Sequence, residues 1–462
     1  MPKTHVSPDV IRSRFSAAMS AMYRDEVPAY GTLMDLVGAV NAETLAADPA
    51  EAARLAANDD LARISEERHG AIRLGTAAEL FTIRRLFAVM GMAPVGYYDL
   101  SEAGVPVHST AFRPVGEAAL KVNPFRVFTS VLRLDLIEDD ALRADAAAIL
   151  AERQIFTPGC LALIDKAEAE GGLSDADVSR FVAEALETFR WQPRANVTAD
   201  MYQRLHDAHR LIADVVSFKG PHINHLTPRT LDIDAVQRRM PAHGIAPKAV
   251  VEGPPTRKCP ILLRQTSFKA LEEPVDFRQG DAWVQGSHTA RFGEIEQRGV
   301  ALTPRGRALY DKLLTDTRKI VRPAADGSNA AAYMAALAAT FADFPDDWDT
   351  LRREGLAYFT YSLTDRGLAA ETAPDDMDAL LAAGMVRFDP IVYEDFLPVS
   401  AAGIFQSNLG DGAAQDFVAS PNQQRFETDL GAAVLNEFAH YAAIEAASRQ
   451  ACLQALSARR AG

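Results

Sequence analysis

Hydrophobic residues repeat at helical spacing through the first part of the chain, and the pattern changes near position 66. Apolar side chains recur every three or four residues over 10–22 and 32–45, which predicts two helices with Pro28 between them. Beyond position 66 the apolar runs are short and resemble strands. Segment 1–60 is therefore predicted to be helical and to precede a segment of mixed structure.

The segment 66–137 predicts the order strand, helix, strand, strand, strand. An extended stretch covers 70–75, and the sequence Thr76-Ala-Ala-Glu79 after it is a capping pattern that opens a helix ending near Met90. The three later strands are predicted from β-type runs at 94–100, 105–112 and 125–136.

The same order returns after a helical insertion. Residues 138–215 predict four helices, two of which begin with the caps Ser174 and Thr198. The segment 216–300 then predicts, in order, an extended stretch, a helix and three strands, at 216–225, 233–240, 245–252, 260–269 and 289–297. The two mixed segments share no clear residue-level identity, so the repeat is one of architecture.

The last segment, 301–462, is predicted to be mixed and to end in a long helix. Its predicted elements are helices at 303–320, 329–344 and 429–459, strands at 355–362 and 385–396, and a loop of small residues at 397–408. No low-complexity linker interrupts the chain, so we expect 1–462 to form a single packed body of the α+β class.

Composition and charge remove several classes of protein. Of the 462 residues, 48% are hydrophobic and 24% are charged, which fits a globular chain and excludes a disordered or fibrous one. The net charge of −14 provides no positive field for nucleic acid. No apolar run is long enough for a membrane span, and the N-terminus has no signal core. The separated cysteines Cys160, Cys259 and Cys452 fit neither a disulfide framework nor a zinc site, so we expect a reduced, cytoplasmic protein.

Candidate chemistry centres on histidines, because the chain has no Walker loop, dinucleotide fingerprint or nucleophile elbow. His69 lies at the start of the first predicted strand, where period-two alternation puts His69, Ala71 and Arg73 on one face. Burying an unpaired guanidinium is costly unless an anion meets it. This face is therefore either functional or part of an edge strand with both polar groups in water.

A second histidine has a matching place in the later mixed segment. His225 ends the first predicted strand of 216–300, while His222, three residues earlier, points to the opposite face of an extended chain. The alternative is one hydrogen-bonded loop histidine and one surface histidine.

The last predicted strand of that segment carries Glu294 and Glu296 on one face, which is also the usual pattern of a solvated strand. One carboxylate here, with His69 and His225, would complete the two-histidine, one-carboxylate set that holds Fe(II) and leaves positions open for a chelating substrate and O₂. The residual positive charge of such a site suits an anionic 2-oxo acid.

Other histidines give weaker signals. His206 and His209 are three residues apart beside Asp207 on a predicted helix, and we interpret them as a helix surface. His108, in the predicted strand 105–112, either lines a pocket or is a hydrogen-bonded strand histidine.

Four segments resemble the 2-oxoadipate dioxygenase/decarboxylase family, also called 2-hydroxyglutarate synthase, and the similarity runs over nearly the whole chain. They are Glu67-Arg-His-Gly-Ala-Ile-Arg73, Gly220-Pro-His-Ile-Asn-His-Leu-Thr-Pro-Arg-Thr-Leu-Asp232, Val251-Glu-Gly-Pro-Pro-Thr256 and Gly286-Ser-His-Thr-Ala-Arg-Phe-Gly-Glu-Ile-Glu-Gln-Arg-Gly299. That family belongs to the vicinal-oxygen-chelate superfamily. The resemblance implies paired β-α-β-β-β units that form a β-sheet metal pocket, with N-terminal, inserted and C-terminal helices.

The resemblance also implies roles for individual residues. The family's Fe(II) ligands fall on His69, His225 and Glu294, and the two histidines would also contact the metal-bound substrate. The preference for Glu294 over Glu296 rests on a further similarity, of 294–298 to the ligand strand of 4-hydroxyphenylpyruvate dioxygenase. Arg73 matches the arginine that binds the substrate carboxylate, and Val399, in the small-residue loop, matches a second substrate contact.

The implied reaction converts 2-oxoadipate and O₂ to 2-hydroxyglutarate and CO₂, a step of lysine breakdown. No separate cosubstrate is expected, because the substrate is itself a 2-oxo acid. Two alternatives stay open. One is another vicinal-oxygen-chelate metalloenzyme that acts on a different 2-oxo acid. The other is a metal-free dicarboxylate-binding protein in which Arg73 binds the ligand.

Overall fold

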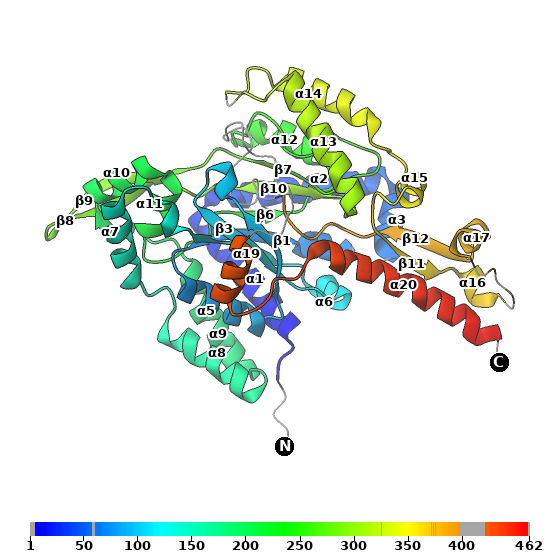
Figure 1. Cartoon of the computed structure of the whole chain (residues 1–462), viewed down its shortest axis with the longest axis horizontal. Coiled ribbons are helices and arrows are strands. Elements are labelled where there is room, and N and C mark those ends of the chain that lie inside the picture. Colours follow the sequence, from blue (N-terminus) through cyan, green and yellow to red (C-terminus); the bar gives the residue numbers. More distant parts are fainter. Residues whose placement is uncertain are drawn as a thin grey trace. The chain divides into compact units, whose positions relative to one another are not determined.

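The computed structural model describes residues 5–57, 61–324, 326–370, 372, 374, 376–397 and 421–460 (Figure 1). Contacts divide the chain into two compact units. Unit 1 comprises Met1–Glu252, Gln265–Gln297 and Phe396–Leu435, and unit 2 comprises Gly253–Arg264, Arg298–Asp395 and Asn436–Gly462. The units interleave along the sequence, so they do not follow the segment boundaries that the sequence predicts. The packing of 1–462 as one body stays a prediction.

Unit 1 begins with helices, as predicted. α1 (Pro8–Glu26) and α2 (Pro28–Ala47) cover the two predicted ranges, and the shorter α3 (Pro49–Ala57) and α4 (Leu61–Glu66) lead to the first strand. Pro28 starts α2 instead of breaking a helix, because the first position of a helix needs no N–H.

A five-stranded sheet with the strand order β2-β3-β4-β1-β6 forms the centre of unit 1. Its strands are β1 (Arg68–Leu74), β2 (Ala93–Asp99), β3 (Val107–Arg113), β4 (Arg126–Leu132) and β6 (Leu226–Pro228). β1 pairs in parallel with β4 and antiparallel with β6, so it is an interior strand. With α5 (Ala77–Val89) between β1 and β2, the four strands and the helix of 66–137 occur in the predicted order, and the α+β class is confirmed. The short helix α6 (Glu117–Val122) between β3 and β4 was not predicted.

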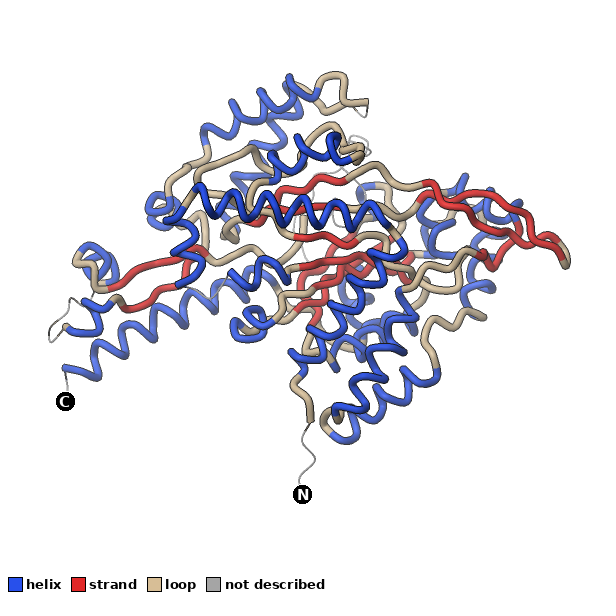
Figure 2. The backbone as a smooth tube through the Cα atoms, turned by 180° about the vertical axis from the view of Figure 1, so that it is seen from behind, coloured by secondary structure: helices blue, strands red, loops and turns tan. Residues whose placement is uncertain are grey.

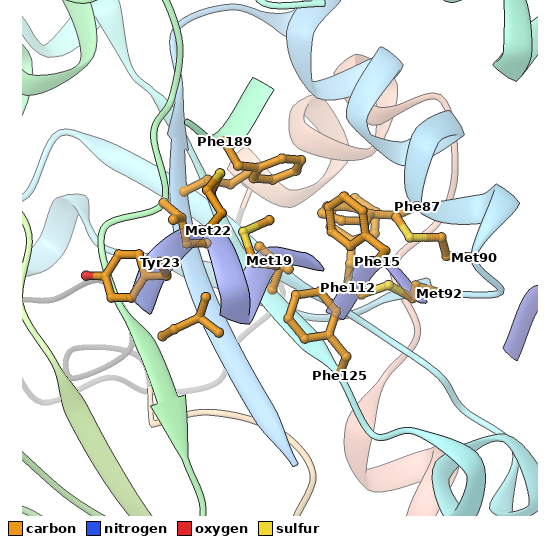
Figure 3. Close-up of a cluster of buried hydrophobic side chains, with 14 of the residues drawn as sticks. Phe15, Met19, Met22, Tyr23, Phe87, Met90, Met92, Phe112, Phe125 and Phe189 are labelled. Atoms are coloured by element: carbon orange, nitrogen blue, oxygen red, sulfur yellow. The ribbon is translucent and has the colours of Figure 1, made fainter. Parts of the chain in front are cut away.

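The two faces of β1 meet different surroundings. Ile72 and Leu74 belong to a hydrophobic cluster with side chains of α1, α2 and α5, part of which Figure 3 shows. His69, Ala71 and Arg73 point to the other face, where Ala71 joins a separate cluster. The sheet therefore separates an apolar layer from a face that carries charged groups.

The helical insertion forms as predicted except at its end. Its first three helices are α7 (Asp140–Ala151), α8 (Pro158–Glu170) and α9 (Asp175–Leu186). The fourth predicted helix is two helices, α10 (Ala199–Ala208) and α11 (Arg210–Val216). The break lies at His209, whose backbone is extended and whose Nδ1 accepts the N–H of Leu211 at 3.1 Å. His209 is thus a helix cap and not simply a helix-surface residue.

The segment 216–300 repeats the predicted order only in part. Helix α12 (Ile233–Arg239) and strands β7 (Leu263–Ser267) and β10 (Glu294–Arg298) are present. The predicted strands at 216–225 and 245–252 are wrong, because these stretches form only isolated bridges outside the strands. In the first of them Gly220 and Pro221 disfavour a regular ladder, since proline lacks the N–H that a ladder needs.

The sequence pattern also missed a hairpin. β8 (Glu272–Gln279) pairs with β9 (Ala282–Thr289) and with β5 (Arg194–Thr198) in a three-stranded sheet. Most hairpin side chains are exposed or half-buried on both faces, so the apolar alternation that signals a strand is absent. Figure 2 shows the hairpin as a ribbon that extends away from the helices of its unit.

Unit 2 confirms the predicted helices and strands of 301–396 with shorter bounds. Its elements are α13 (Pro304–Ile320), α14 (Ala330–Thr340), α15 (Trp348–Arg353), β11 (Phe359–Leu363), α16 (Asp365–Ala369), α17 (Met377–Ala382), β12 (Val386–Pro390) and α20 (Glu437–Arg460). β11 and β12 pair antiparallel. None of the helices in the described ranges has the length and apolar character needed to cross a membrane.

The closing helix begins later than the predicted 429. In unit 1, α19 (Pro421–Leu430) ends at Gly431, whose φ of +71° is a left-handed conformation that glycine adopts without strain. The small-residue loop predicted at 397–408 lies, from 398 onward, outside the described residues.

Truncating the apolar layer is expected to destabilise unit 1. Phe15 on α1 is fully buried and packs edge-on against Phe125 and Phe189. We expect Phe15→Ala to lower the free energy of unfolding by about 3–5 kcal/mol, because it removes transfer energy and leaves a cavity. Val10→Ala, at a 38% exposed position of the same helix, should change it by no more than about 0.5 kcal/mol. Denaturant titration measures both, and equal losses would contradict this packing.

Candidate metal centre

Three side chains from distant parts of the sequence converge on one face of the unit 1 sheet. They are His69 on β1, His225 just before β6, and Glu294 at the start of β10, and one ligand atom from each lies within 4.8 Å of the others. Glu294 Oε2 is 3.2 Å from His225 Nε2 and 3.6 Å from His69 Nε2. All three residues are fully buried.

Strand pairing brings these residues together. The antiparallel β1–β6 ladder pairs His69 with Thr227, which is two residues beyond His225. An isolated bridge between Arg229 and Glu296 sets β10 beside the end of β6. These two short contacts between strands thus bring the residues together without the regular second unit that the sequence pattern predicted.

Several polar atoms of the converging residues have no hydrogen bond within the described chain. Both ring nitrogens of His225 and Oε1 of Glu294 are buried without a hydrogen bond, and Glu294 Oε2 accepts one from the Thr227 hydroxyl at 3.2 Å. Leaving such groups unpaired in a dry interior is costly. A divalent cation would satisfy them together, and two imidazoles with one carboxylate are the donor set that suits non-haem iron. The residues present therefore fit a metal ion.

Glu296 has a different place from Glu294, although both residues point to the same face of β10. Its Oε2 lies 2.9 Å from His69 Nδ1, the ring nitrogen away from Glu294, and its Oε1 lies 3.3 Å from Arg126 Nη1. A carboxylate behind a ligating histidine fixes the ring orientation and the tautomer. This geometry favours Glu294 as the ligand and Glu296 as its support, and the assignment of ligands stays a prediction.

The support continues into a buried network that the sequence analysis missed. Glu67 Oε1 accepts hydrogen bonds from Arg126 Nη1 and Nη2 at 2.9 and 2.8 Å, and its Oε2 accepts one from Arg229 at 2.9 Å. Glu67 and Arg126 are fully buried. The sequence feature that could have indicated this network is Arg126, a charged residue inside the apolar run 125–136. The alternatives of an edge strand in water and a solvated strand face are wrong.

Burial and nearby charges set the protonation of the three converging groups. Burial alone would lower the pKa of His69, but the carboxylates of Glu296 and Glu294 outweigh it and raise that pKa. Burial, with the positive charges of His69 and Arg73, holds the pKa of His225 well below its ordinary value. Burial also raises the pKa of Glu294. In the absence of a cation, His69 is thus the imidazole of the pair that holds a proton more strongly.

Aromatic rings enclose the group. His69 packs edge-on against Phe396 with ring centroids 5.0 Å apart, and His225 lies 4.8 Å from Phe292. These rings exclude water from the imidazoles, which strengthens electrostatic interactions there. Val399, the predicted substrate contact, lies outside the described residues, three positions after Phe396.

Arg73 lies on the same face of β1 as His69, and it has an anionic partner. Its Nη1 is 2.6 Å from Oδ2 of Asp214 on α11. Arg73 is one of the charges that lower the pKa of His225, so its field reaches the converging group. A second cluster, Asp214, His222 and His288, therefore surrounds the far end of β1.

His108 does not share this face. Cross-strand pairing sets His108 opposite Val131, which belongs to the apolar layer, and its ring packs on Phe426 with centroids 4.7 Å apart. Burial, with the charge of Arg133, lowers its pKa to about 4. His108 is a neutral strand histidine on the other side of the sheet.

Comparisons with known proteins agree with one another. A family model described as 2-oxoadipate dioxygenase/decarboxylase matches residues 15–408. The chain is 62% identical over 455 residues to the protein of that description from Pseudomonas putida, covering 98% of each. To that from Escherichia coli it is 55% identical over 450 residues, covering 97% of this chain and 98% of the other. It is also similar to the crystal structure of hydroxyglutarate synthase from Pseudomonas putida in complex with 2-oxoadipate, with a TM-score of 0.90. The two sequences are 61% identical, and the match covers 98% of this chain and 99% of that chain.

The two glutamates of β10 are expected to separate in a metal-binding experiment. Glu294→Gln should abolish stable binding of a divalent metal, because it removes the carboxylate that lies between the two imidazoles. Glu296→Gln should retain the metal with affinity reduced about 10- to 100-fold, because the support of His69 is weakened. Metal titration of anaerobically purified protein measures both. A larger loss in Glu296→Gln than in Glu294→Gln would reverse the two assignments.

Proposed function

The chain belongs to the 2-oxoadipate dioxygenase/decarboxylase family, and from this premise we propose that it is an Fe(II)-dependent enzyme that converts 2-oxoadipate and O₂ to 2-hydroxyglutarate and CO₂ in lysine breakdown. A cytoplasmic location, suggested by three separate thiols, belongs to the same proposal. The substrate is supported by the relative that was crystallised in complex with 2-oxoadipate.

The observation that carries the proposal is the buried, converging set of His69, His225 and Glu294, in which Nε2 of both histidines and Oε1 of Glu294 have no hydrogen bond. In a metal-free dicarboxylate-binding protein the two histidines would be ordinary polar contacts with hydrogen bonds of their own. The bare nitrogens of His225 count against that alternative. The other alternative, that the substrate is a different 2-oxo acid, is tested by the activity assay below.

Each residue then has a role that its surroundings support. His69, His225 and Glu294 would hold Fe(II), which when bound supplies a site for the chelating 2-oxo acid and the redox chemistry that O₂ requires. Glu296 holds Nδ1 of His69, so that Nε2 is directed at the metal position. The rings of Phe396 and Phe292 keep the imidazoles dry.

Arg73 would bind the carboxylate at the other end of the substrate. It lies four residues from His69 on the same face of an interior strand, which separates their Cα atoms by roughly 13 Å. The length of a six-carbon acid and of an arginine side chain spans that distance. A planar guanidinium binds a carboxylate through two parallel hydrogen bonds, which lysine cannot copy. One end of the substrate is thus held by the metal and the other by Arg73.

Oxygen uptake with a panel of 2-oxo acids tests the substrate. We expect the protein with added Fe(II) to consume O₂ with 2-oxoadipate and to release CO₂ and 2-hydroxyglutarate, and His69→Ala to abolish the reaction. Arg73→Ala should retain iron and lose about ten- to a hundredfold in kcat/KM for 2-oxoadipate, because a charge-assisted contact contributes about 1.5–3 kcal/mol. Arg73→Lys should recover only part of this loss.

A substrate with an uncharged tail is the matched control for Arg73. With 2-oxohexanoate, which has the same carbon chain and no distal carboxylate, Arg73→Ala should cost much less. Equal losses on both acids would assign Arg73 a structural role. Turnover of another 2-oxo acid in preference to 2-oxoadipate would overturn the assignment of 2-oxoadipate as the substrate.

The affinity for iron should depend on pH through His69. A metal-bound imidazole carries no proton on the coordinating nitrogen, so protons and iron compete for it. Since the pKa of His69 is raised above its ordinary ~6.5, affinity should be full above the raised value and fall as pH drops through it. His225, whose pKa is lowered, is neutral throughout and should add no dependence in this window. Iron titrations between about pH 8 and pH 5 measure this, and a flat profile would contradict histidine ligation.

A further inference from the structure

The second buried cluster lies around the far end of β1. It joins Asp214 on α11, His222 in the irregular stretch 217–225 and His288 on β9, and one ligand-type atom from each lies within 4.8 Å of the others. Each residue is at most 6% exposed. Its composition resembles that of the first cluster, and the hydrogen bonds distinguish the two.

The carboxylate of Asp214 is already occupied on both oxygens. Oδ2 accepts a hydrogen bond from Arg73 Nη1 at 2.6 Å, and Oδ1 lies 2.9 Å from His288 Nε2 and 3.3 Å from His222 Nε2. A cation at this place would have to displace a guanidinium. In the first cluster both ring nitrogens of His225 and Oε1 of Glu294 have no hydrogen bond. In the second cluster both oxygens of Asp214 are occupied, and the atom without a hydrogen bond is Nδ1 of His222, which faces away from Asp214. The second cluster therefore holds an arginine and is not a second metal site.

The hydrogen bonds of this cluster run in one direction. A carboxylate only accepts, so the proton of His288 lies on Nε2 and points to Asp214. Nδ1 of His288 lies 2.7 Å from the hydroxyl of Tyr202 on α10, and in a neutral ring whose proton is on Nε2 it accepts a hydrogen bond from that hydroxyl. Tyr202 packs in turn on Phe277 of β8, with ring centroids 4.8 Å apart. A fixed chain thus extends from Tyr202 through His288 and Asp214 to Arg73.

Aromatic packing restrains the histidines of the chain. The ring of Trp191 lies edge-on to His222 with centroids 4.7 Å apart, and Phe218 lies 4.8 Å from His288. The charge of Arg73 and the hydrogen bonds from the histidines keep the pKa of Asp214 well below its ordinary value against burial, which would raise it. Asp214 is consequently an anion that is held by hydrogen bonds, and the histidines beside it are restrained by packed rings.

We propose that Asp214 is a positioning residue that fixes the guanidinium of Arg73 at one distance from the metal centre, and that it thereby sets the chain length of the 2-oxo dicarboxylate that the enzyme accepts. This inference rests on the proposed function, in which Arg73 binds the distal carboxylate. His69 and Arg73 share one strand, so the backbone fixes the origin of each side chain. An unrestrained arginine samples many rotamers, and the contact to Asp214 selects among them.

The ratio of kcat/KM for 2-oxoadipate to kcat/KM for 2-oxoglutarate, which is one methylene shorter, is the measurement that isolates positioning. Both acids are dianions, so any change in general attraction to Arg73 cancels in the ratio. We expect Asp214→Asn to lower the ratio at least about tenfold with the iron content unchanged, because a misplacement of about 1 Å can cost ~100-fold in rate. Tyr202→Phe, which removes the hydroxyl at the remote end of the chain, should lower it about threefold.

Asp207→Asn is the matched control. Asp207 is an exposed residue of α10 that pairs with Gln203, and its replacement removes the same charge without touching the chain to Arg73. It should leave the ratio unchanged. The melting temperature of each variant separates loss of fold from loss of selectivity, and if Asp214→Asn fails to fold, the ratio of Tyr202→Phe decides.

Different results would overturn the positioning role of Asp214 and the proposed function. A wild-type enzyme that turns over 2-oxoadipate, together with an unchanged ratio in a folded, iron-loaded Asp214→Asn, would overturn the positioning role alone. An unchanged ratio in Tyr202→Phe, where that variant decides, would do the same. A wild-type enzyme with no activity on 2-oxoadipate would overturn the proposed function and this inference with it.

Discussion

The charged face of the unit 1 sheet depends on one constraint, which is that a carboxylate removed from water must meet a positive group. Glu67 meets Arg126 and Arg229, Glu296 meets Arg126 and His69, and all of these lie in the interior. Removing one partner of such a pair costs about 3–5 kcal/mol, because the other charge stays buried. Glu294 differs, since it faces the Nε2 atoms of His69 and His225, which make no hydrogen bond. A metal ion would complete the pattern at that point.

Strand β1 carries both His69 and Arg73 on its charged face. It is an interior strand with an apolar layer on one face, so its other face can carry His69 and Arg73 at fixed spacing while the backbone is held on both sides. At the His69 end, Nε2 of His69 and of His225 have no hydrogen bond. At the Arg73 end, both oxygens of Asp214 are occupied, one of them by Arg73. A substrate with two different acidic ends matches these two ends of a single strand.

Much of the architecture follows from local sequence. Thr76 caps α5 as its spacing with Glu79 predicts, and the order of 66–137 follows from periodicity, because both signals are short-range. The β8–β9 hairpin and the irregular stretch 217–225 were not predictable in this way. The hairpin is exposed on both faces, and the stretch is held by backbone hydrogen bonds to distant residues such as Ala71. Local sequence patterns reveal neither a hairpin without a buried face nor a segment that is held by long-range hydrogen bonds.

The sequence by itself indicated the family and the candidate residues His69, His225, Glu294 and Arg73, because four long segments resemble the motifs of that family. Only the tertiary structure decided how Glu294 and Glu296 differ, since both share a face of β10 and only the position of His69 between them separates their places. The tertiary structure alone also paired Arg73 with Asp214, which lies 141 residues away. Contacts between such distant residues arise from the folding of strands and helices around a common core, which residue spacing does not record.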